Sequence, residues 1–338
     1  MIKTLFSIRR LWLASVWLLL VVCVSAVNVR EATAGRRLYD ELLSSGNDKL
    51  KFVGQPAQNP SPIPSPTPSP SDIFLIDLKI EHDKVKLGSP VRITDWTGYN
   101  NQPAFLADGQ SLLYTSIRAD KQADIYQYEV SSRKTTRITD TAESEFSPTL
   151  TPDGRFISVV RVEADSTQRL WKFPLSGGKP VLVLEKIKPV GYHTWIDPYT
   201  LALFILGKPN TLQIVDTRTE KAALVAENIG RATRRIPGQN KLSFVHKVSD
   251  QEWIIKTFDL GTHQITALIK TLPGSEEYAW TPSGILLAAK DSKLFAWKPG
   301  VDTDWSEVAD FSQAGLKSIT RIAINNDGRK LAIVARRE

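Results

Sequence analysis

The chain has 338 residues, of which 42% are hydrophobic and 23% are charged, and its formal net charge is +7. Three of the cations, Lys3, Arg9 and Arg10, belong to an N-terminal segment that export can remove, so the basic excess of the remainder is mild. Basic residues elsewhere are interrupted by acidic neighbours and no recognition helix is visible, which excludes nucleic acid as the expected partner.

Residues 1–26 have the pattern of an export signal. A basic start is followed by an apolar run from Leu11 to Val27 and by small side chains up to Ala26, which predicts cleavage after Ala26. An uncleaved anchor is the alternative, because residues 11–27 are at the short end of what spans a bilayer. Weaker resemblances, of "RRLWL" to a twin-arginine signal and of "LVVC" to a lipoprotein box at the only cysteine, Cys23, leave other export routes open. We expect a periplasmic or otherwise exported protein, either released or tethered to the cytoplasmic membrane.

A short helix and a spacer are predicted between the signal and the folded region. Within residues 27–54, Leu38 and Leu42 lie four positions apart and Gly46 ends the pattern, which indicates one short helix. Residues 55–72 alternate proline with small residues ("NPSPIPSPTPSPS"), so they favour an extended polyproline II rod of roughly 55 Å. Such a rod, or a disordered tether of the same composition, would hold a folded domain away from a membrane surface.

Residues 73–338 repeat one pattern. The tetrapeptide RITD occurs at 92–95 and at 137–140, and an Asp-Gly pair begins 13 residues after the end of each copy. Each unit holds four short β-like runs separated by turn residues, and the third run alternates along one face, as at Tyr126, Tyr128 and Val130. The Asp-Gly pairs fit tight turns because glycine tolerates positive φ. We therefore interpret each unit as one four-stranded antiparallel sheet.

The two ends of this region complete one unit between them. The chain stops at "ITRIAINNDGRKLAIVARRE", which supplies only the first two strands of a sixth unit. The missing strands are at the front, where "DIFLIDLKI" resembles the third strand "DIYQYEV" and "PVRITD" resembles the fourth strand "TTRITD". The predicted fold is all-β: a six-bladed β-propeller of four-stranded blades, closed by N-terminal strands that complete the last blade. Six blades then take about 44 residues each, which is typical of propellers.

Three first-strand segments, "QPAFLADGQSLLYTS", "SPTLTPDGRFISVVR" and "TRIAINNDGRKLAIV", resemble the repeat of the TolB-type propellers, a WD-like class of exported bacterial proteins. The resemblance covers residues 73–338. It implies a six-bladed platform that binds an envelope protein or lipoprotein and is not an enzyme. TolB-type proteins carry an α/β domain before the propeller, whereas here residues 1–72 take that place. The same repeat also precedes serine peptidase domains, but this chain contains no G-x-S-x-G elbow.

The histidines do not form a predicted metal site. His82, His193, His246 and His263 fall at different places within their units and no two have metal-ligand spacing, so neither a metal nor a cofactor is expected. His193 differs from the others because it lies in "GYHTW", at the start of a first strand near the ring axis. There it either meets a ligand in the channel or serves only for packing.

The first residues of the inner strands should converge on one mouth of the central channel. Opposed charges and amides there can bind a peptide or a polar small molecule through charge-assisted hydrogen bonds, or can simply solvate the channel. Glu276 and Glu277 are adjacent in a strand and point to opposite faces, which argues against a shared acid/base pair. The candidate binding residues are Asn100, Asn101, Gln102, Glu143, Glu145, Tyr192, His193, Arg231, Arg234, Glu276, Glu277 and Lys317.

These patterns predict a monomeric, non-catalytic module that binds proteins or acts as a scaffold in the cell envelope. The partner is expected to be a protein or lipoprotein, with no nucleic acid and no cofactor involved. The alternative is a small-molecule sensor or a propeller enzyme that uses the channel mouth around His193.

Overall fold

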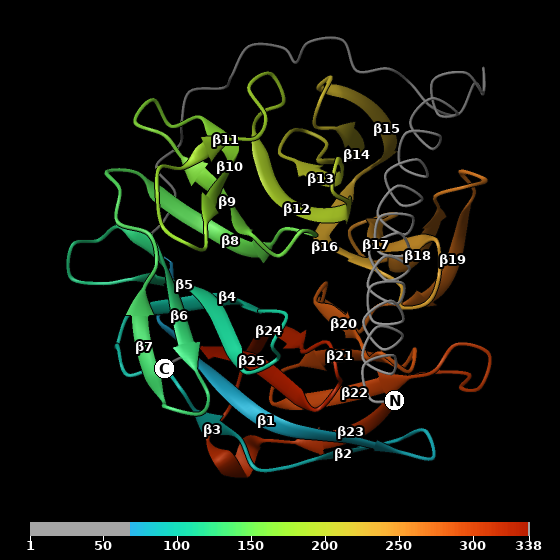
Figure 1. The fold of residues 1–338 in the computed structure, drawn as a ribbon. Helices are drawn as coiled ribbons and strands as arrows, with labels where there is room; N and C mark the ends of the chain where they lie inside the picture. The colour runs from blue at the N-terminus through green and yellow to red at the C-terminus, as the bar shows by residue number, and fades with distance from the viewer. Residues whose placement is uncertain (1–67, 337–338) are drawn as a thin grey trace, which may run out of the picture.

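Six β-sheets surround a common axis in the computed structural model, which describes residues 68–336 (Figure 1). The predicted all-β, six-bladed propeller is therefore confirmed. The predicted signal (1–26), the predicted helical segment (27–54) and most of the predicted spacer (55–72) lie outside the described residues. Within the described range, no helix combines the length and the apolar composition that crossing a membrane requires.

Blades 1 to 3 follow one another along the chain, and the strands of each blade run in order from the axis to the rim. Blade 1 comprises β4 (Tyr99–Phe105), β5 (Ser111–Ile117), β6 (Ala123–Glu129) and β7 (Lys134–Arg137). Blade 2 comprises β8 (Ser144–Leu150), β9 (Phe156–Val162), β10 (Gln168–Pro174) and β11 (Val181–Leu182). Blade 3 comprises β12 (Val190–Asp197), β13 (Thr200–Ile205), β14 (Thr211–Asp216) and β15 (Lys221–Glu227).

Blades 4 and 5 keep this order, and blade 6 combines both ends of the propeller. Blade 4 comprises β16 (Ile229–Arg235), β17 (Lys241–Lys247), β18 (Trp253–Asp259) and β19 (Ile265–Lys270). Blade 5 comprises β20 (Tyr278–Trp280), β21 (Leu286–Lys290), β22 (Lys293–Trp297) and β23 (Ser306–Asp310), followed by the 3-10 helix η1 (Ser312–Ala314). Blade 6 comprises β24 (Ile319–Ile324), β25 (Lys330–Arg336), β1 (Ser71–Glu81), β2 (Lys84–Leu87) and β3 (Val91–Arg92).

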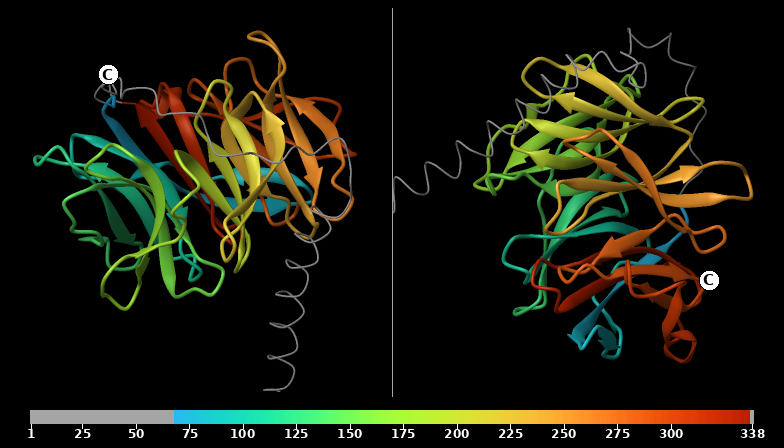
Figure 2. Two further views of the ribbon diagram at one scale, coloured as in Figure 1. Left: turned by 90° about the horizontal axis from the view of Figure 1, so that it is seen from above. Right: turned by 90° about the vertical axis from the view of Figure 1, so that its right-hand side faces the viewer.

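The ring is closed by β1, which pairs with β25 in antiparallel register from Ser71 opposite Arg336 to Asp77 opposite Lys330. Figure 2 shows the start of β1 and the end of β25 side by side at one face of the ring. The sequence predicted a fourth strand that begins at Pro90. Instead that strand begins at Lys84 as β2, breaks at 88–90 and resumes as β3, because proline has no N–H to donate to the sheet.

Apolar layers fill the spaces between neighbouring blades. Between blades 6 and 1, Ile73 and Val334 pack against Leu112, Tyr114 and Tyr126, all of them buried. The rings of Tyr114 and Tyr126 stack with their centroids 6.0 Å apart. Burial of each large side chain in such a layer contributes about 1.5–3 kcal/mol, so the blades are held together mainly by this packing.

The RITD sequence locks the fourth strand of a blade to its third. In blade 6, the hydroxyl of Thr94 donates to Asp72 Oδ1 at 2.8 Å and accepts from the backbone N–H of Ile73 at 3.1 Å. The guanidinium of Arg92 lies 3.8 Å from the same carboxylate. One buried carboxylate at the start of the third strand therefore receives both the Arg and the Thr of the motif.

The second copy makes the same contacts in blade 1. The hydroxyl of Thr139 accepts from the N–H of Ile125 at 2.9 Å and donates to Asp124 Oδ1 at 3.3 Å, while Arg137 donates to Asp124 Oδ2 at 2.7 Å. The doubled tetrapeptide thus marks a repeated structural lock, which explains why it recurs at equivalent places in the two blades.

The Asp-Gly pairs form the turns between the first and second strands. Gly109 and Gly328 have φ of +64° and +70°, and a Cβ on Gly328 would lie 2.9 Å from Pro282 Cδ. The carboxylate of Asp108 accepts from the N–H of Ser111 at 2.9 Å, which closes the turn. These turns fix where each inner strand ends, and thereby the height of its side chains along the channel.

We expect Thr94→Val and Thr139→Val each to lower the free energy of unfolding by about 1–3 kcal/mol. Both changes preserve shape but leave a buried carboxylate and a backbone N–H without the hydroxyl. Chemical denaturation of the purified full chain measures the effect, with Thr303→Val, in the exposed loop between β22 and β23, as the control. Two variants as stable as the wild type would show that the motif contributes no lock.

Candidate functional site

Two cavities lie along the axis of the propeller. The channel cavity has a volume of about 340 Å³ and is lined by residues of all six inner strands. The mouth cavity, of about 220 Å³, lies where the inner strands begin and is lined by Tyr99, Asn101, Tyr192, Arg231, Arg321 and Arg336, among others. Tyr192, Arg231 and Arg321 line both cavities, so these three side chains form the boundary between them.

Each inner strand contributes one polar side chain at the same height, and these six residues are called the polar ring. In five blades the residue stands seven positions before the glycine of the following turn, and in blade 3 Tyr192 takes the place. Equal spacing from the turn gives equal depth in the channel, because all inner strands run in the same direction. The polar ring consists of Gln102, Ser147, Tyr192, Arg231, Glu277 and Arg321.

A hydrogen bond crosses the channel between opposite blades. Arg321 Nη2 on β24 of blade 6 donates to the hydroxyl oxygen of Tyr192 on β12 of blade 3 at 2.7 Å. The guanidinium also lies 5.1 Å from the centre of the tyrosine ring. This bridge separates the mouth cavity from the channel cavity.

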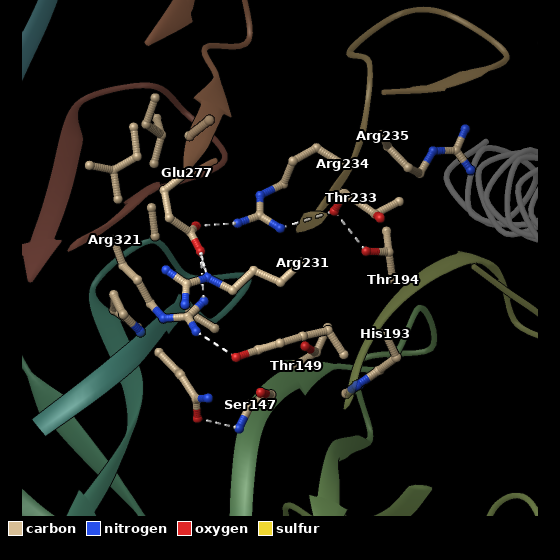
Figure 3. Close-up of a pocket in the computed structure, with 18 of the residues that line it drawn as sticks. Ser147, Thr149, His193, Thr194, Arg231, Thr233, Arg234, Arg235, Glu277 and Arg321 are labelled. Carbon is tan, nitrogen blue, oxygen red and sulfur yellow. Dashed lines mark hydrogen bonds and ion pairs between the residues drawn. The ribbon is translucent and has the colours of Figure 1, made fainter. Parts of the chain in front are cut away.

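Three guanidinium groups surround the buried carboxylate of Glu277 (Figure 3). Glu277 Oε1 accepts from Arg231 Nε at 2.7 Å and from Arg321 Nη1 at 3.0 Å, and Oε2 lies 3.5 Å from Arg234 Nη2. Burial opposes ionisation, but the charges of Arg321, Arg231 and Arg234 outweigh it and lower the pKa of Glu277. The carboxylate therefore stays ionised and holds the three cations together.

A second carboxylate, that of Glu276, lies beside this cluster, and its pair with Lys247 is called the rim pair because it lies at the edge of the channel cavity. Glu276 accepts from the backbone N–H of Arg231 at 3.1 Å and pairs with Lys247 at 3.2 Å. Counting the rim pair together with the cluster, four cations (Arg231, Arg234, Arg321 and Lys247) face two carboxylates. The cluster therefore carries two positive charges in excess. Arg235 also lines the channel cavity, but its side chain points away from Glu277 (Figure 3) and donates to the backbone oxygen of Ile196.

The inner strands of blades 1 and 2 are distorted at the polar ring. Gln102 and Ser147 both have positive φ, 57° and 55°, and each precedes a proline. Gln102 Oε1 accepts from the N–H of Ser147 at 2.7 Å and from Thr115 at 2.9 Å, which joins the two blades. Left-handed conformations cost a non-glycine residue about 1–3 kcal/mol, and such strain is typical of functional positions.

His193 lines the channel cavity on β12 and is buried. Its Nε2 lies 2.7 Å from the hydroxyl of Ser158, which also accepts from Trp195 Nε1 at 2.9 Å and donates to the backbone oxygen of Thr149 at 3.1 Å. Burial lowers the pKa of His193 to about 3, so the ring is neutral at physiological pH. No hydrogen-bond partner of its Nδ1 occurs among residues 68–336.

Five of the candidate residues from the sequence, among them Glu276 beside the cluster, lie outside the lining of both cavities. Asn100 is fully buried and bonds to the backbone of the closing strand β1. Glu145 is fully buried and pairs with Arg161 at 3.1 Å, and Glu143 lies 3.8 Å from the same guanidinium. Lys317 precedes β24 on the surface. Among the remaining candidates, Asn101 lines the mouth cavity, and Gln102, Tyr192, His193, Arg231, Arg234 and Glu277 line the channel cavity.

Sequence reasoning missed Arg321, the cation that contacts both Glu277 and Tyr192. Lys317 was the candidate chosen from blade 6 because it precedes the inner strand. The side chains that reach the axis are instead those at a fixed number of residues before the turn that ends the inner strand. A count of seven positions back from Gly328 identifies Arg321, as the same count from Gly109 identifies Gln102. Among the described residues, no group of three or more His, Cys, Asp or Glu side chains can hold a metal ion.

No protein-family model and no curated protein sequence matches this chain. Solved structures do match its fold. A TolB candidate from Agrobacterium tumefaciens superposes with a TM-score of 0.63 at 14% identity, over 80% of this chain and 99% of the other. TolB from Acinetobacter baumannii gives 0.51 at 12% identity, over 80% of this chain and 64% of the other, so this chain spans less than two thirds of it.

A puromycin-hydrolyzing peptidase from Mycobacterium tuberculosis also matches, with a TM-score of 0.51 at 13% identity over 75% of this chain and 48% of the other. The prediction that the protein is not an enzyme is therefore wrong as an inference from its fold, because the same propeller occurs in an enzyme. At these identities the likeness concerns the fold alone. The chain has the fold of the TolB-like six-bladed β-propellers, a fold that also occurs in a peptidase.

Proposed function

We propose that this chain is an exported propeller that binds another protein or lipoprotein of the cell envelope at its mouth cavity. One observation carries the proposal: the mouth cavity is lined by Arg231, Arg321 and Arg336 and, among the described residues, by no acidic side chain. An acidic segment of the partner fits this chemistry. The signal pattern of residues 1–26 supports a place outside the cytoplasm, and the TolB-like fold is compatible with it.

The uncharged side chains of the mouth cavity favour the same ligand. Burial raises the pKa of Tyr99 to about 12, so its hydroxyl stays protonated and can donate to a carboxylate. Arg336 ends β25 at the exposed edge of the cavity, where a partner first meets the propeller. Arginine binds carboxylates in a bidentate manner, and this geometry selects an acidic segment over an apolar or basic one.

We expect Arg336→Gln to weaken binding of a fluorescein-labelled hexaglutamate peptide about threefold to fivefold, because one partly exposed charge contact is lost. Fluorescence anisotropy with the purified full chain measures this. Binding should also weaken as salt is added, since the contacts are electrostatic.

Arg329→Gln is the matched control, because it removes the same charge from the opposite end of β25, at the turn side of the propeller. Its affinity for the peptide should equal that of the wild type. If hexalysine bound as well as hexaglutamate, or if both variants behaved alike, the mouth cavity would not be the binding site.

Glu277 prepares the mouth cavity by holding Arg231 and Arg321 in place. We expect Glu277→Gln to lower the free energy of unfolding by about 3 kcal/mol at neutral pH, because the variant leaves Arg234 and Arg321 without their counter-charge and Arg231 with Glu276 alone. The pKa of Glu277 is lowered in the folded state, so its contribution is complete above the ordinary value of 4.5 and is lost as the pH falls through the folded-state value.

Denaturation at a series of pH values checks this expectation. The difference in stability between the wild type and Glu277→Gln should be constant above about pH 5 and should narrow in acid. A difference that widened as the pH fell would contradict the assignment of Glu277 as an ionised anchor. Glu307→Gln, which alters an exposed carboxylate on β23, serves as the control.

A further inference from the structure

Four residues that line the channel cavity each carry a buried polar atom that makes no hydrogen bond with any described residue. These atoms belong to side chains of four different blades, and each of these residues is at least nine-tenths buried. Protein interiors leave few such atoms unsatisfied, so their gathering around one cavity indicates a missing polar partner. The atoms are Ser147 Oγ, His193 Nδ1, Thr233 Oγ1 and Glu277 Oε2, of which the last is ion-paired with Arg234 at 3.5 Å.

The charge of the cavity wall specifies the sign of that partner. Arg231, Arg234 and Arg321 face the carboxylate of Glu277, and the rim pair of Lys247 and Glu276 leaves the excess at two positive charges. Arg234 uses one N–H for the backbone oxygen of Thr233 at 3.0 Å and lies 3.5 Å from Glu277, so other donors of its guanidinium remain available. Of the three guanidiniums, Arg321 is 12% exposed, while Arg231 and Arg234 are 33% and 35% exposed. An anion in the cavity offsets their excess positive charge, which water does not.

The opposite wall supplies a hydrogen-bond acceptor. Ser158 has a single hydroxyl hydrogen, and its contact with the backbone oxygen of Thr149 uses it. Its oxygen then accepts from both Trp195 Nε1 and His193 Nε2. This arrangement assigns the hydrogen of the neutral imidazole to Nε2 and leaves Nδ1 as a bare acceptor beside the cavity. A hydroxyl group of a ligand would donate the hydrogen bond that His193 Nδ1 lacks.

We propose that the channel cavity binds a small organic dianion that also carries a hydroxyl group, such as a hydroxy-dicarboxylate. Its carboxylates pair with Arg234 and the neighbouring guanidiniums, and its hydroxyl donates to His193 Nδ1. The hydroxyls of Ser147 and Thr233 complete the shell. The lining continues past the polar ring to Phe105, Pro237 and Ile324, at the ends of the inner strands. This site therefore lies on the other side of the Arg321 bridge from the mouth cavity, and it goes beyond the proposed binding of a protein.

Isothermal titration of the purified full chain with L-malate and with succinate tests the proposal. The two dianions differ by one hydroxyl group. We expect both to bind, with malate about fivefold tighter because only malate satisfies His193. Putrescine, a cation of similar length, should give no binding heat. Succinate tighter than malate, or putrescine as tight as either, would overturn the proposal.

Two variants test separately the binding of the ligand's carboxylates by Arg234 and of its hydroxyl group by His193. Arg234→Gln should weaken both dianions about tenfold or more, whereas Arg133→Gln, which removes the same charge from the exposed loop between β6 and β7, away from the lining of the channel cavity, should leave them unchanged. His193→Leu should remove the preference for malate and leave the affinity for succinate as it was. Ser147→Ala, a smaller change, should weaken both dianions if His193→Leu does not fold.

Equal binding by the wild type and Arg234→Gln would overturn the site, as would the absence of saturable heat at millimolar dianion. The outcome is separate from that of the protein-binding proposal. Hexaglutamate binding depends on Arg336 at the mouth, whereas dianion binding depends on Arg234 and His193 in the channel. Either assay can therefore fail while the other succeeds.

Discussion

The pairing of β1 with β25 is the constraint on which the rest of the structure depends. A ring of sheets has two free ends, and here the backbone hydrogen bonds between Ser71–Asp77 and Lys330–Arg336 join them. Closure removes the exposed strand edges inside blade 6 and sets the distance of every inner strand from the axis. The positions of the side chains in the channel follow from this geometry.

Convergence on the axis turns an ordinary strand pattern into a charged site. Arg231, Glu277 and Arg321 are far apart in the sequence, yet each stands at the same spacing from the turn of its own blade. Six strands that run in one direction around a narrow axis bring these residues within hydrogen-bond distance. A single substitution at that position in any blade therefore changes the chemistry of the whole channel.

The sequence was sufficient for the architecture because strand pairing repeats locally. The RITD lock and the Asp-Gly turns are made by neighbouring segments, so they were recognisable as spacing, as at Thr94 and Thr139. The side chains that line the channel were harder to predict, since a bulge in an inner strand changes which of its residues point towards the axis. Asn100 turned towards the closing strand and Glu145 towards Arg161, while Arg321 was missed.

Arg321 and Tyr192, which are joined by a hydrogen bond, line both the mouth cavity and the channel cavity. Any group that draws Arg321 towards one cavity changes the donors that it offers to the other. Linkage requires such an effect to be reciprocal: whatever factor a ligand on one face imposes on affinity at the opposite face, it experiences in return. Because the Arg321–Tyr192 hydrogen bond lies between the two cavities, a ligand in one cavity can change the affinity of the other cavity for its own ligand. Such coupling needs a shift of one side chain and no movement of the blades.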